Sequence, residues 1–237
     1  MSLAGVVALM IVFVPWAFPE PLPQPPAPAC TAVGGDVAAL LGDALVRRGN
    51  DDPAVPTFAA TPGSLRITAP PGSDVRTEQG RITAPSLLVP VDGDFVLETE
   101  IDLVPLVAYQ AAGLLVMRDV DDYVRLERGI GDFDAVALEF SRDARHVKVH
   151  GPFRGDPQPI RTETVAVGLR LVRTGETVRA SWRDVAADGQ WRALSGEVPF
   201  AGPASVGVAV LNTGAAADAE NFAVSVRRLS LTCGSST

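Results

Sequence analysis

The residues best suited to chemistry are three carboxylates that alternate along one short segment. Glu98, Glu100 and Asp102 are each separated by a single residue, so on an extended strand they share one face, with neighbours about 6.5–7 Å apart. Glycoside hydrolysis uses two carboxylates about 5–5.5 Å apart for retention, or about 6.5–9.5 Å apart for inversion. The spacing allows a hydrolytic pair, but alternating polar residues are also ordinary on the solvated face of an antiparallel sheet.

A second polar group follows, in which Tyr123, Arg125 and Glu127 alternate with Val124 and Leu126. If the two apolar residues face the core, the other three emerge together on the opposite face. An aromatic ring beside planar charged groups is suited to binding sugars, whereas cross-strand ion pairs on a solvated face are the simpler interpretation. Polar residues of later strands are expected to join this face: Glu139, His146, Lys148, His150 and Arg170.

Neither a metal site nor a cofactor site is predicted. Asp92 and Asp94 flank Gly93 and would supply only a few of the six to eight oxygen ligands that calcium needs. A turn accounts better for two aspartates beside a glycine. The two histidines, His146 and His150, would share a strand face about 13 Å apart, too far to hold one zinc ion. Phosphate loops, nucleophile elbows and dinucleotide fingerprints are absent from the sequence.

The elements that must position these residues are mostly strands, because apolar and polar residues alternate in many short segments divided by turn residues. One helix is expected at Asp36–Arg48, where apolar residues recur at helical spacing, and residues 50–62 resemble a loop. The fold class is therefore all-β: a two-sheet antiparallel β-sandwich or jelly roll with one short N-terminal helix. Strands are expected at Ser64–Ala69, Ser86–Val89, Asp94–Leu103, Ala112–Arg118, Tyr123–Arg128, Ala135–Ser141, His146–His150, Glu163–Arg173, Thr177–Arg183, Gln190–Leu194, Ser205–Leu211 and Asn221–Leu231.

The order of several segments resembles the concanavalin A-like lectin/glucanase superfamily, over about Ile67 to Leu231. The similarity is to a branch of unknown function that is akin to the C-terminal accessory domain of family-43 β-xylosidases. The segments that carry it are GDFVLETEI (93–101), YQAAGLLVMRDVDDYVRLERG (109–129), VGLRLVRTGETVRASW (167–182), DGQWRAL (188–194), VGVAVLN (206–212) and FAVSVRRLSL (222–231).

The resemblance implies a two-sheet jelly roll, extracellular use and carbohydrate as the usual ligand class, but it does not imply activity. Glucanases of the superfamily carry a Glu-x-Asp-x(-x)-Glu motif on a strand. Glu100-Ile101-Asp102 begins that motif here, but Leu103-Val104-Pro105 follows, so the second glutamate is missing. No catalytic residue is predicted for this reason.

The N-terminal region indicates export. Residues 3–18 are uncharged and strongly apolar, which suits a signal peptide or a membrane anchor, and the proline-rich residues 19–30 suit an extended tether. Residues 1–29 are therefore assigned to targeting and 30–237 to one sandwich domain, a usual size for all-β domains. Whether the leader is cleaved, anchored or lipidated stays open.

Charge and cysteine content narrow the function. The net charge of −8 argues against nucleic acid as a partner, because phosphate binding needs clustered Lys and Arg. Cys30 and Cys233 are the two cysteines, and in an exported protein a disulfide between them is the natural interpretation; two unrelated cysteines are the alternative. The protein is thus expected to be secreted or displayed at the cell surface.

The leading function prediction is a non-catalytic module that binds extracellular glycan through Tyr123, Arg125, Glu127 and Glu139. The first alternative is a glycoside hydrolase that uses the carboxylates of the 94–103 strand. The second is a surface or envelope interaction protein without a small ligand, for which a flat or filled sheet face and an exposed apolar patch would be the signature.

Overall fold

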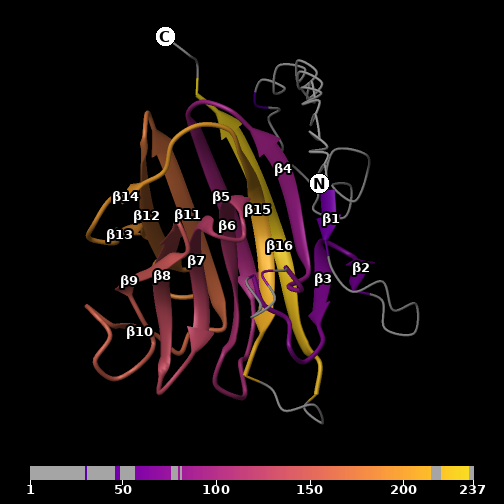
Figure 1. Cartoon of the computed structure of the whole chain (residues 1–237). Helices are drawn as coiled ribbons and strands as arrows, with labels where there is room; N and C mark the ends of the chain where they lie inside the picture. The colour runs from indigo at the N-terminus through magenta and orange to yellow at the C-terminus, as the bar shows by residue number, and fades with distance from the viewer. Residues whose placement is uncertain are drawn as a thin grey trace, which may run out of the picture.

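The protein is an antiparallel β-sandwich of two sheets, as the alternating sequence predicted (Figure 1). This computed structural model describes residue 30 and residues 46–48, 57–75, 80, 82–214 and 220–234. Its strands are β1 (Val46–Arg48), β2 (Phe58–Thr61), β3 (Ser64–Ala69), β4 (Ser86–Val91), β5 (Phe95–Asp102), β6 (Gln110–Asp119), β7 (Asp122–Ile130), β8 (Asp134–Arg142), β9 (Arg145–His150), β10 (Ile160–Arg161), β11 (Ala166–Thr174), β12 (Thr177–Asp184), β13 (Arg192–Ala193), β14 (Val198–Pro199), β15 (Ala204–Asn212) and β16 (Phe222–Cys233).

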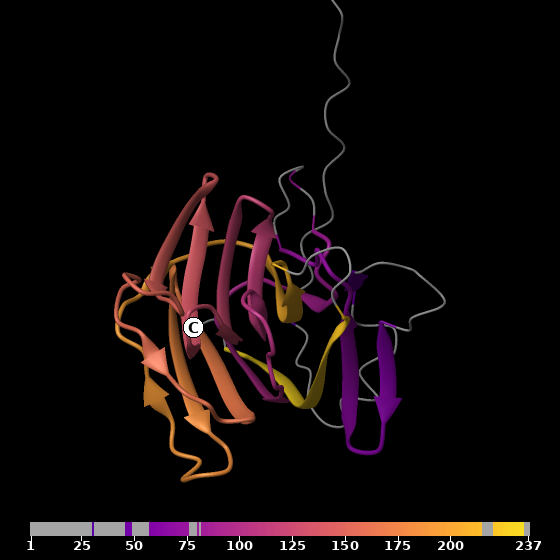
Figure 2. The same ribbon diagram turned by 90° about the horizontal axis from the view of Figure 1, so that it is seen from below.

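The two sheets each draw on strands from distant parts of the sequence. Sheet I has the order β1-β4-β15-β6-β7-β8-β10, with β9 paired to β8, and sheet II has the order β13-β12-β11-β5-β16-β3-β2, with β14 paired to β12. Figure 2 shows the sheets as two layers. All of the pairings recorded between these strands are antiparallel, so each sheet can have one face on the core and one face turned outward.

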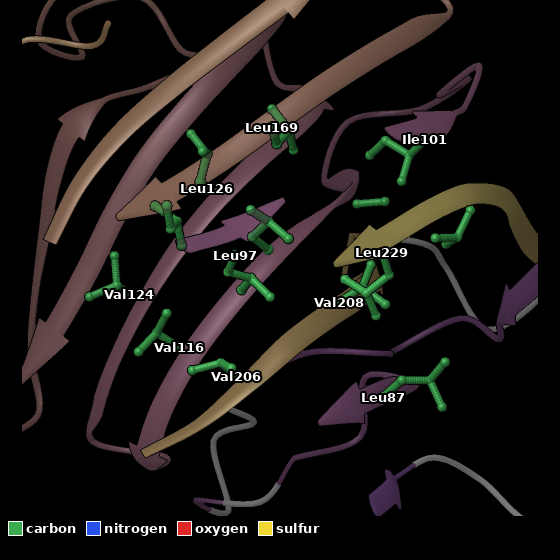
Figure 3. Packing of buried hydrophobic residues seen from close by; sticks show 14 of the residues in the cluster. Leu87, Leu97, Ile101, Val116, Val124, Leu126, Leu169, Val206, Val208 and Leu229 are labelled. Carbon is green, nitrogen blue, oxygen red and sulfur yellow. The ribbon is translucent and has the colours of Figure 1, made fainter. Parts of the chain in front are cut away.

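The core lies between the sheets and is made by the apolar halves of the alternating strands (Figure 3). Leu97 and Ile101 of β5 meet Val124 and Leu126 of β7 there, all almost completely buried. The same alternation turns Glu98 of β5 outward. The prediction of which β5 residues face inward is therefore confirmed.

Sheet I also has a second apolar cluster on its outer face. Residues 70–75 and 82–85 cross this face, and Val75 and Ala84 pack on Leu88, Leu115 and Met117. This "outer cluster" consists of Val75, Ala84, Leu88, Ala111, Leu115, Met117, Tyr123, Ala209 and Leu211. It explains why β6 is buried on both faces over most of its length.

The crossing segment is held to sheet I by hydrogen bonds of its backbone. Gly72 N donates to Asn212 O (2.9 Å), and Asn212 N donates to Ser73 O (3.0 Å). The buried Asn212 amide also donates to Ala69 O (3.1 Å). Because backbone groups of this segment are paired with the sheet, it can lie over apolar residues without leaving its polar groups unsatisfied.

Two of the expected elements are corrected. Most of the helix predicted at Asp36–Arg48 lies outside the described residues, but its last three residues form strand β1 and pair with β4. Residues 58–61, expected to be loop, form β2 and pair with β3. In both cases an available sheet edge offers hydrogen bonds that local sequence pattern does not reveal. The apolar run 3–18 lies outside the described residues, and within the described part of the chain no helix is long and apolar enough to cross a membrane.

Candidate functional site

A pocket opens on the outer face of sheet I, beside the segment that covers the outer cluster. Its volume is about 180 Å³. Its floor is formed by β6, β7 and β8, which lie side by side in Figure 1. The lining residues are Asp74, Tyr109, Ala111, Arg125, Glu127, Gly129, Ile130, Ala137, Glu139, Lys148, Pro152, Phe153, Leu211 and Thr213.

Small residues in the sheet create the hollow. Glu127 of β7 is flanked across the sheet by Gly113 of β6 and Ala137 of β8. One step along the same face, Ala111 pairs with Gly129. Because directly opposed residues on one sheet face are close neighbours, four short or missing side chains around Glu127 leave the space that larger residues would fill.

A charged cluster occupies the pocket floor. Arg125 and Glu139 are directly opposed in the β7–β8 register, and Arg125 Nη2 donates to Glu139 Oε2 at 2.6 Å. The same guanidinium lies 3.3 Å from Glu127 Oε2 and 3.9 Å from Asp74 Oδ1. Three carboxylates therefore surround one arginine. His146 also lies in this cluster, with its Nε2 2.7 Å from Glu139 Oε2.

The pKa values of the two glutamates are shifted in opposite directions. Burial raises the pKa of Glu127 to about 7, with Glu139 and Asp74 adding to the rise and Arg125 opposing it. Burial would also raise the pKa of Glu139, but Arg125 and the hydrogen bond from His146 outweigh it and hold that pKa at about 2. Near neutral pH, Glu139 is a carboxylate while Glu127 is balanced between its acid and its carboxylate.

Two aromatic rings form one wall of the pocket. The rings of Tyr109 and Phe153 are 5.1 Å apart between centroids. Lys148 Nζ lies 4.6 Å from the centre of the Phe153 ring and 3.1 Å from both carboxylate oxygens of Asp156. Tyr109 is 53% exposed and has a φ of 69°, an unfavourable backbone region for a bulky residue. The site thus combines an apolar surface with planar charged groups.

The structure brings together three of the four residues predicted to bind ligand. Arg125, Glu127 and Glu139 line the pocket, whereas Tyr123 lies in the outer cluster and is 5% exposed. Its ring is 5.9 Å from the Arg125 guanidinium, so Tyr123 contacts the floor from beneath the covering segment. Residues 70–75 and 82–85 therefore cover part of the sheet face that bears Tyr123.

Two residues expected on this face lie elsewhere. The register of β8 with β9 shifts between Leu138 and Glu139, so His150 does not share the face of His146. His150 is instead buried, with its ring nitrogens 2.8 and 2.9 Å from the carbonyl oxygens of Gln158 and Ser195. A β-bulge of this kind re-aims side chains and is invisible to a strict period of two.

Arg170 belongs to the outer face of sheet II, where it stacks 3.9 Å from the Trp191 ring. The alternating carboxylates of β5 are on that same face, and each is ion-paired: Glu98 with Arg170 (2.6 Å), Glu100 with Arg183 (2.5 Å) and Asp102 with Arg227 (2.8 Å). Gly168 lacks a side chain under Arg183, which lets that arginine cross to Glu100. This is the arrangement of a charged solvated sheet face.

The turn proposed as a weak calcium site is occupied by internal hydrogen bonds. Asp92 accepts from Gly93 N (2.9 Å), and Asp94 accepts from Gly175 N (2.7 Å). Arg173 Nε donates to Gly93 O at 2.6 Å, which brings a cation to the same turn. Among the described residues, no group of three or more His, Cys, Asp or Glu side chains is placed to hold a metal ion.

The predicted disulfide is present and joins Cys30 to Cys233, with a Cα–Cα distance of 5.7 Å. It ties residue 30 to the end of β16 across a sequence separation of 203 residues. This pairing is typical of proteins that fold in oxidising compartments.

Sequence reasoning missed Asp74, Tyr109 and Phe153 as lining residues. Each comes from a connection rather than from a strand, so alternation gives no signal for it. The sequence could have drawn attention to Tyr109, because it is one of only two tyrosines in the chain and directly precedes a segment with a strong strand pattern. Nothing in the local sequence indicates that Phe153 lies against it.

Comparison with known proteins supports the fold and leaves the family unassigned. No family model matches the chain, and no curated protein matches it. Among solved structures, it is similar to a functionally unknown protein from Saccharomyces cerevisiae, with a TM-score of 0.61 and 13% identity over 80% of this chain and 96% of that one.

Larger proteins, one of them described as GH43, are similar over part of their length. A GH43 protein from Bacillus licheniformis matches with a TM-score of 0.62 and 12% identity over 78% of this chain and 36% of that one. Xylan β-1,4-xylosidase from Bacillus halodurans matches with a TM-score of 0.59 and 16% identity over 76% and 35%. This chain therefore spans about a third of each of these two proteins, and the relationship at this identity is one of fold.

Proposed function

We propose that this protein is an exported, non-catalytic module that binds a glycan in the pocket on sheet I. The observation that carries the proposal is the composition of that pocket, where Tyr109 and Phe153 form an apolar wall beside Arg125, Glu127 and Glu139. Sugar rings present apolar C–H faces and rows of hydroxyls, which match an aromatic surface and planar hydrogen-bonding groups respectively.

The size of the pocket supports a small ligand or the end of a chain. Its volume of about 180 Å³ is below the roughly 300–1,000 Å³ typical of sites that enclose drug-sized ligands. One sugar ring is therefore the unit that it would enclose, with the rest of a glycan extending into solvent.

Two observations support binding without catalysis. The motif glutamate expected after Asp102 is replaced by Leu103-Val104-Pro105. The remaining carboxylates of that strand, such as Glu100, are neutralised by arginines on the face opposite the core. The fold that the chain shares with parts of carbohydrate-active GH43 proteins is consistent with an accessory role.

Export is supported by the disulfide Cys30–Cys233 together with the apolar leader. A disulfide that joins the two ends of the domain can stabilise the folded protein only in a compartment where thiols become oxidised. Fusion of the leader to a reporter that is active only outside the cytoplasm tests this part of the proposal.

Binding is tested by calorimetry against oligosaccharides first identified on a glycan array. Phe153→Ala and Arg125→Ala should each weaken binding about tenfold or more, because they remove the aromatic wall and the central cation. Trp191→Ala is the matched control, since this aromatic residue stacks on Arg170 and Arg183 on sheet II and should leave affinity unchanged. Equal binding by all variants would refute this site, and new reducing ends in the incubated glycan would refute the non-catalytic role.

A second candidate function is a surface interaction protein, favoured by exposed apolar residues in the β5–β6 connection. Val104, Leu106 and Val107 are 57%, 73% and 45% exposed, and Val165, bonded through its carbonyl to Leu103 N, is 51% exposed. Contiguous apolar surface of this kind is typical of protein contacts. Leu106→Asp should abolish concentration-dependent association seen by analytical ultracentrifugation if this patch is an interface, and leave it unchanged otherwise.

A further inference from the structure

We infer that the connection between β5 and β6, residues 103–109, docks the protein on a lipid surface without net charge. Docking through this connection is independent of glycan binding in the pocket. Three features point to lipid: a cluster of exposed apolar side chains, backbone N–H groups that are already paired, and the absence of charge.

Exposed apolar side chains gather at this connection. Among the described residues, six large apolar side chains are exposed, and all but Val147 lie in or beside residues 103–109. Val165 belongs with them because its carbonyl accepts from Leu103 N at 3.1 Å. Contact with water is unfavourable for these side chains, so a partner that removes it is stabilising. The apolar patch consists of Val104, Leu106, Val107, Tyr109 and Val165.

The small size of the apolar patch favours lipid over a protein partner. A specific protein interface takes about 20–30 residues from each side, whereas the apolar patch has five side chains. Insertion into lipid needs no complementary surface, and every Leu or Val side chain that leaves water strengthens it. Leu106, which is 73% exposed, has the most surface to transfer. A patch of this size gives reversible association.

The backbone of the connection is suited to an apolar medium. Leu106 N and Val107 N both donate to Gln110 Oε1, at 2.8 and 3.3 Å, and Pro105 has no N–H group. The Gln110 amide is buried and donates in turn to Asn212 Oδ1 at 3.2 Å, which holds the connection in place. Unpaired N–H groups are costly in lipid because no water accepts from them. These positions can therefore enter lipid without that cost.

Charge decides which lipid surface fits. Residues 103–110 contain no charged side chain. Asp102 directly precedes them and is paired with Arg227 at 2.8 Å, so insertion stops near the headgroups, because charged groups are costly deeper in a bilayer. The net charge of −8 opposes approach to anionic lipid. A zwitterionic surface is therefore the partner that fits.

Tyr109 joins the apolar patch to the pocket. Its ring is 53% exposed and also forms the pocket wall with Phe153. Its N–H donates to Ile130 O at 2.8 Å and its carbonyl accepts from Thr213 N at 3.2 Å, which holds the residue at its unfavourable φ of 69°. Tyrosine is enriched at membrane interfaces, where one end of its ring is apolar and the other is wet. Docking therefore holds the pocket mouth beside the lipid surface.

The test attaches an environment-sensitive fluorophore to Leu106→Cys in the full chain. The label is specific because Cys30 and Cys233 are joined in a disulfide. Addition of phosphatidylcholine vesicles should shift the emission to shorter wavelength, and lipid that carries a nitroxide should quench it. A label at Val147→Cys is the matched control, because Val147 is exposed outside the apolar patch, and its emission should not change.

An added charge tests insertion itself. Val104→Asp in the protein labelled at position 106 should raise the lipid concentration for half-maximal response about tenfold or more, because aspartate is costly in a bilayer and valine is not. Val147→Asp should leave that concentration unchanged.

Four results would overturn the inference: no response at position 106, an equal response at position 147, no effect of Val104→Asp, or a response that requires phosphatidylserine in the vesicles. A response to protein concentration without lipid would also overturn it, by identifying the apolar patch as a protein interface. Each of these outcomes leaves glycan binding in the pocket standing, since the calorimetric assay measures that separately.

Discussion

Replacing Glu127 with glutamine should stabilise the protein at neutral pH, and the gain should depend on pH in a defined way. Burial with Glu139 and Asp74 nearby raises the pKa of Glu127 from 4.5 to about 7 in the folded state. Between these values the unfolded chain loses its proton while the folded protein keeps it. The free energy of unfolding therefore decreases as pH rises through this window.

The magnitude follows from the width of the window. A shift from 4.5 to about 7, at about 1.4 kcal/mol per pH unit, corresponds to about 3 kcal/mol of stability lost between pH 4.5 and pH 8. Glutamine cannot ionise, so Glu127→Gln avoids this loss. The variant should be close to the wild type at pH 4.5 and up to about 3 kcal/mol more stable at pH 8.

The assay is urea unfolding of the oxidised protein at intervals from pH 4.5 to pH 8, with the difference in unfolding free energy plotted against pH. A difference that stays flat, or that falls with rising pH, would refute the assignment of Glu127 as a buried carboxyl with a raised pKa. Equal m-values for the two proteins are needed, because they show that the denatured states are comparable.

Glu139→Gln tests the same cluster with the opposite sign. Arg125 and His146 hold the pKa of Glu139 at about 2 against the effect of burial, so its stabilising contribution is complete above pH 4.5 and is lost as pH falls toward 2. The variant should therefore be less stable at neutral pH. Removing the Glu139 charge also lowers the pKa of Glu127, which should move the Glu127 transition in the unfolding profile to lower pH.

Three further changes test the scaffold by chemical unfolding. Thr99→Val should cost about 1–3 kcal/mol, because the buried Thr99 hydroxyl donates to Arg228 O (2.7 Å) at the β-bulge of β16; an unchanged midpoint would contradict this. Gly113→Ala should cost about 1–3 kcal/mol, since a Cβ there would collide with the β7 backbone at Leu126, and full stability would show that the strands can separate freely. Replacing both Cys30 and Cys233 by serine should cost about 5 kcal/mol in the chain-entropy model, given a sequence separation of 203, and a loss below about 1 kcal/mol would mean that the unfolded chain is already compact.

Much of the fold could be predicted because strand alternation is a local property. The charged residues of β5 face outward, as Glu98 does, and Phe95, Leu97 and Ile101 lie in the core. Burial of an apolar face between two sheets imposes this period of two on the sequence itself. The pairing of Cys30 with Cys233 could also be predicted from the sequence, because a chain with two cysteines has one intramolecular combination.

The strands at the edges of the sheets were harder to predict from the sequence. Strand β1 belongs to a segment whose apolar residues recur at helical spacing. Strand β2 lies within a segment that has no strong strand pattern. Both pair with strands whose open edge can bind almost any extended segment. Since edge pairing uses backbone groups, it depends little on side-chain pattern.

The candidate site likewise has features that the sequence determined and features that it did not. Alternation alone determined that Arg125 and Glu127 share a face, because that follows from the geometry of one strand. Only the tertiary structure decided that Glu139 sits opposite Arg125, that residues 70–75 and 82–85 bury Tyr123, and that Phe153 and Tyr109 form a wall. These contacts depend on strand register, on a bulge in β9 and on the paths of connections, and each of these joins residues whose separation along the chain carries no periodic signal.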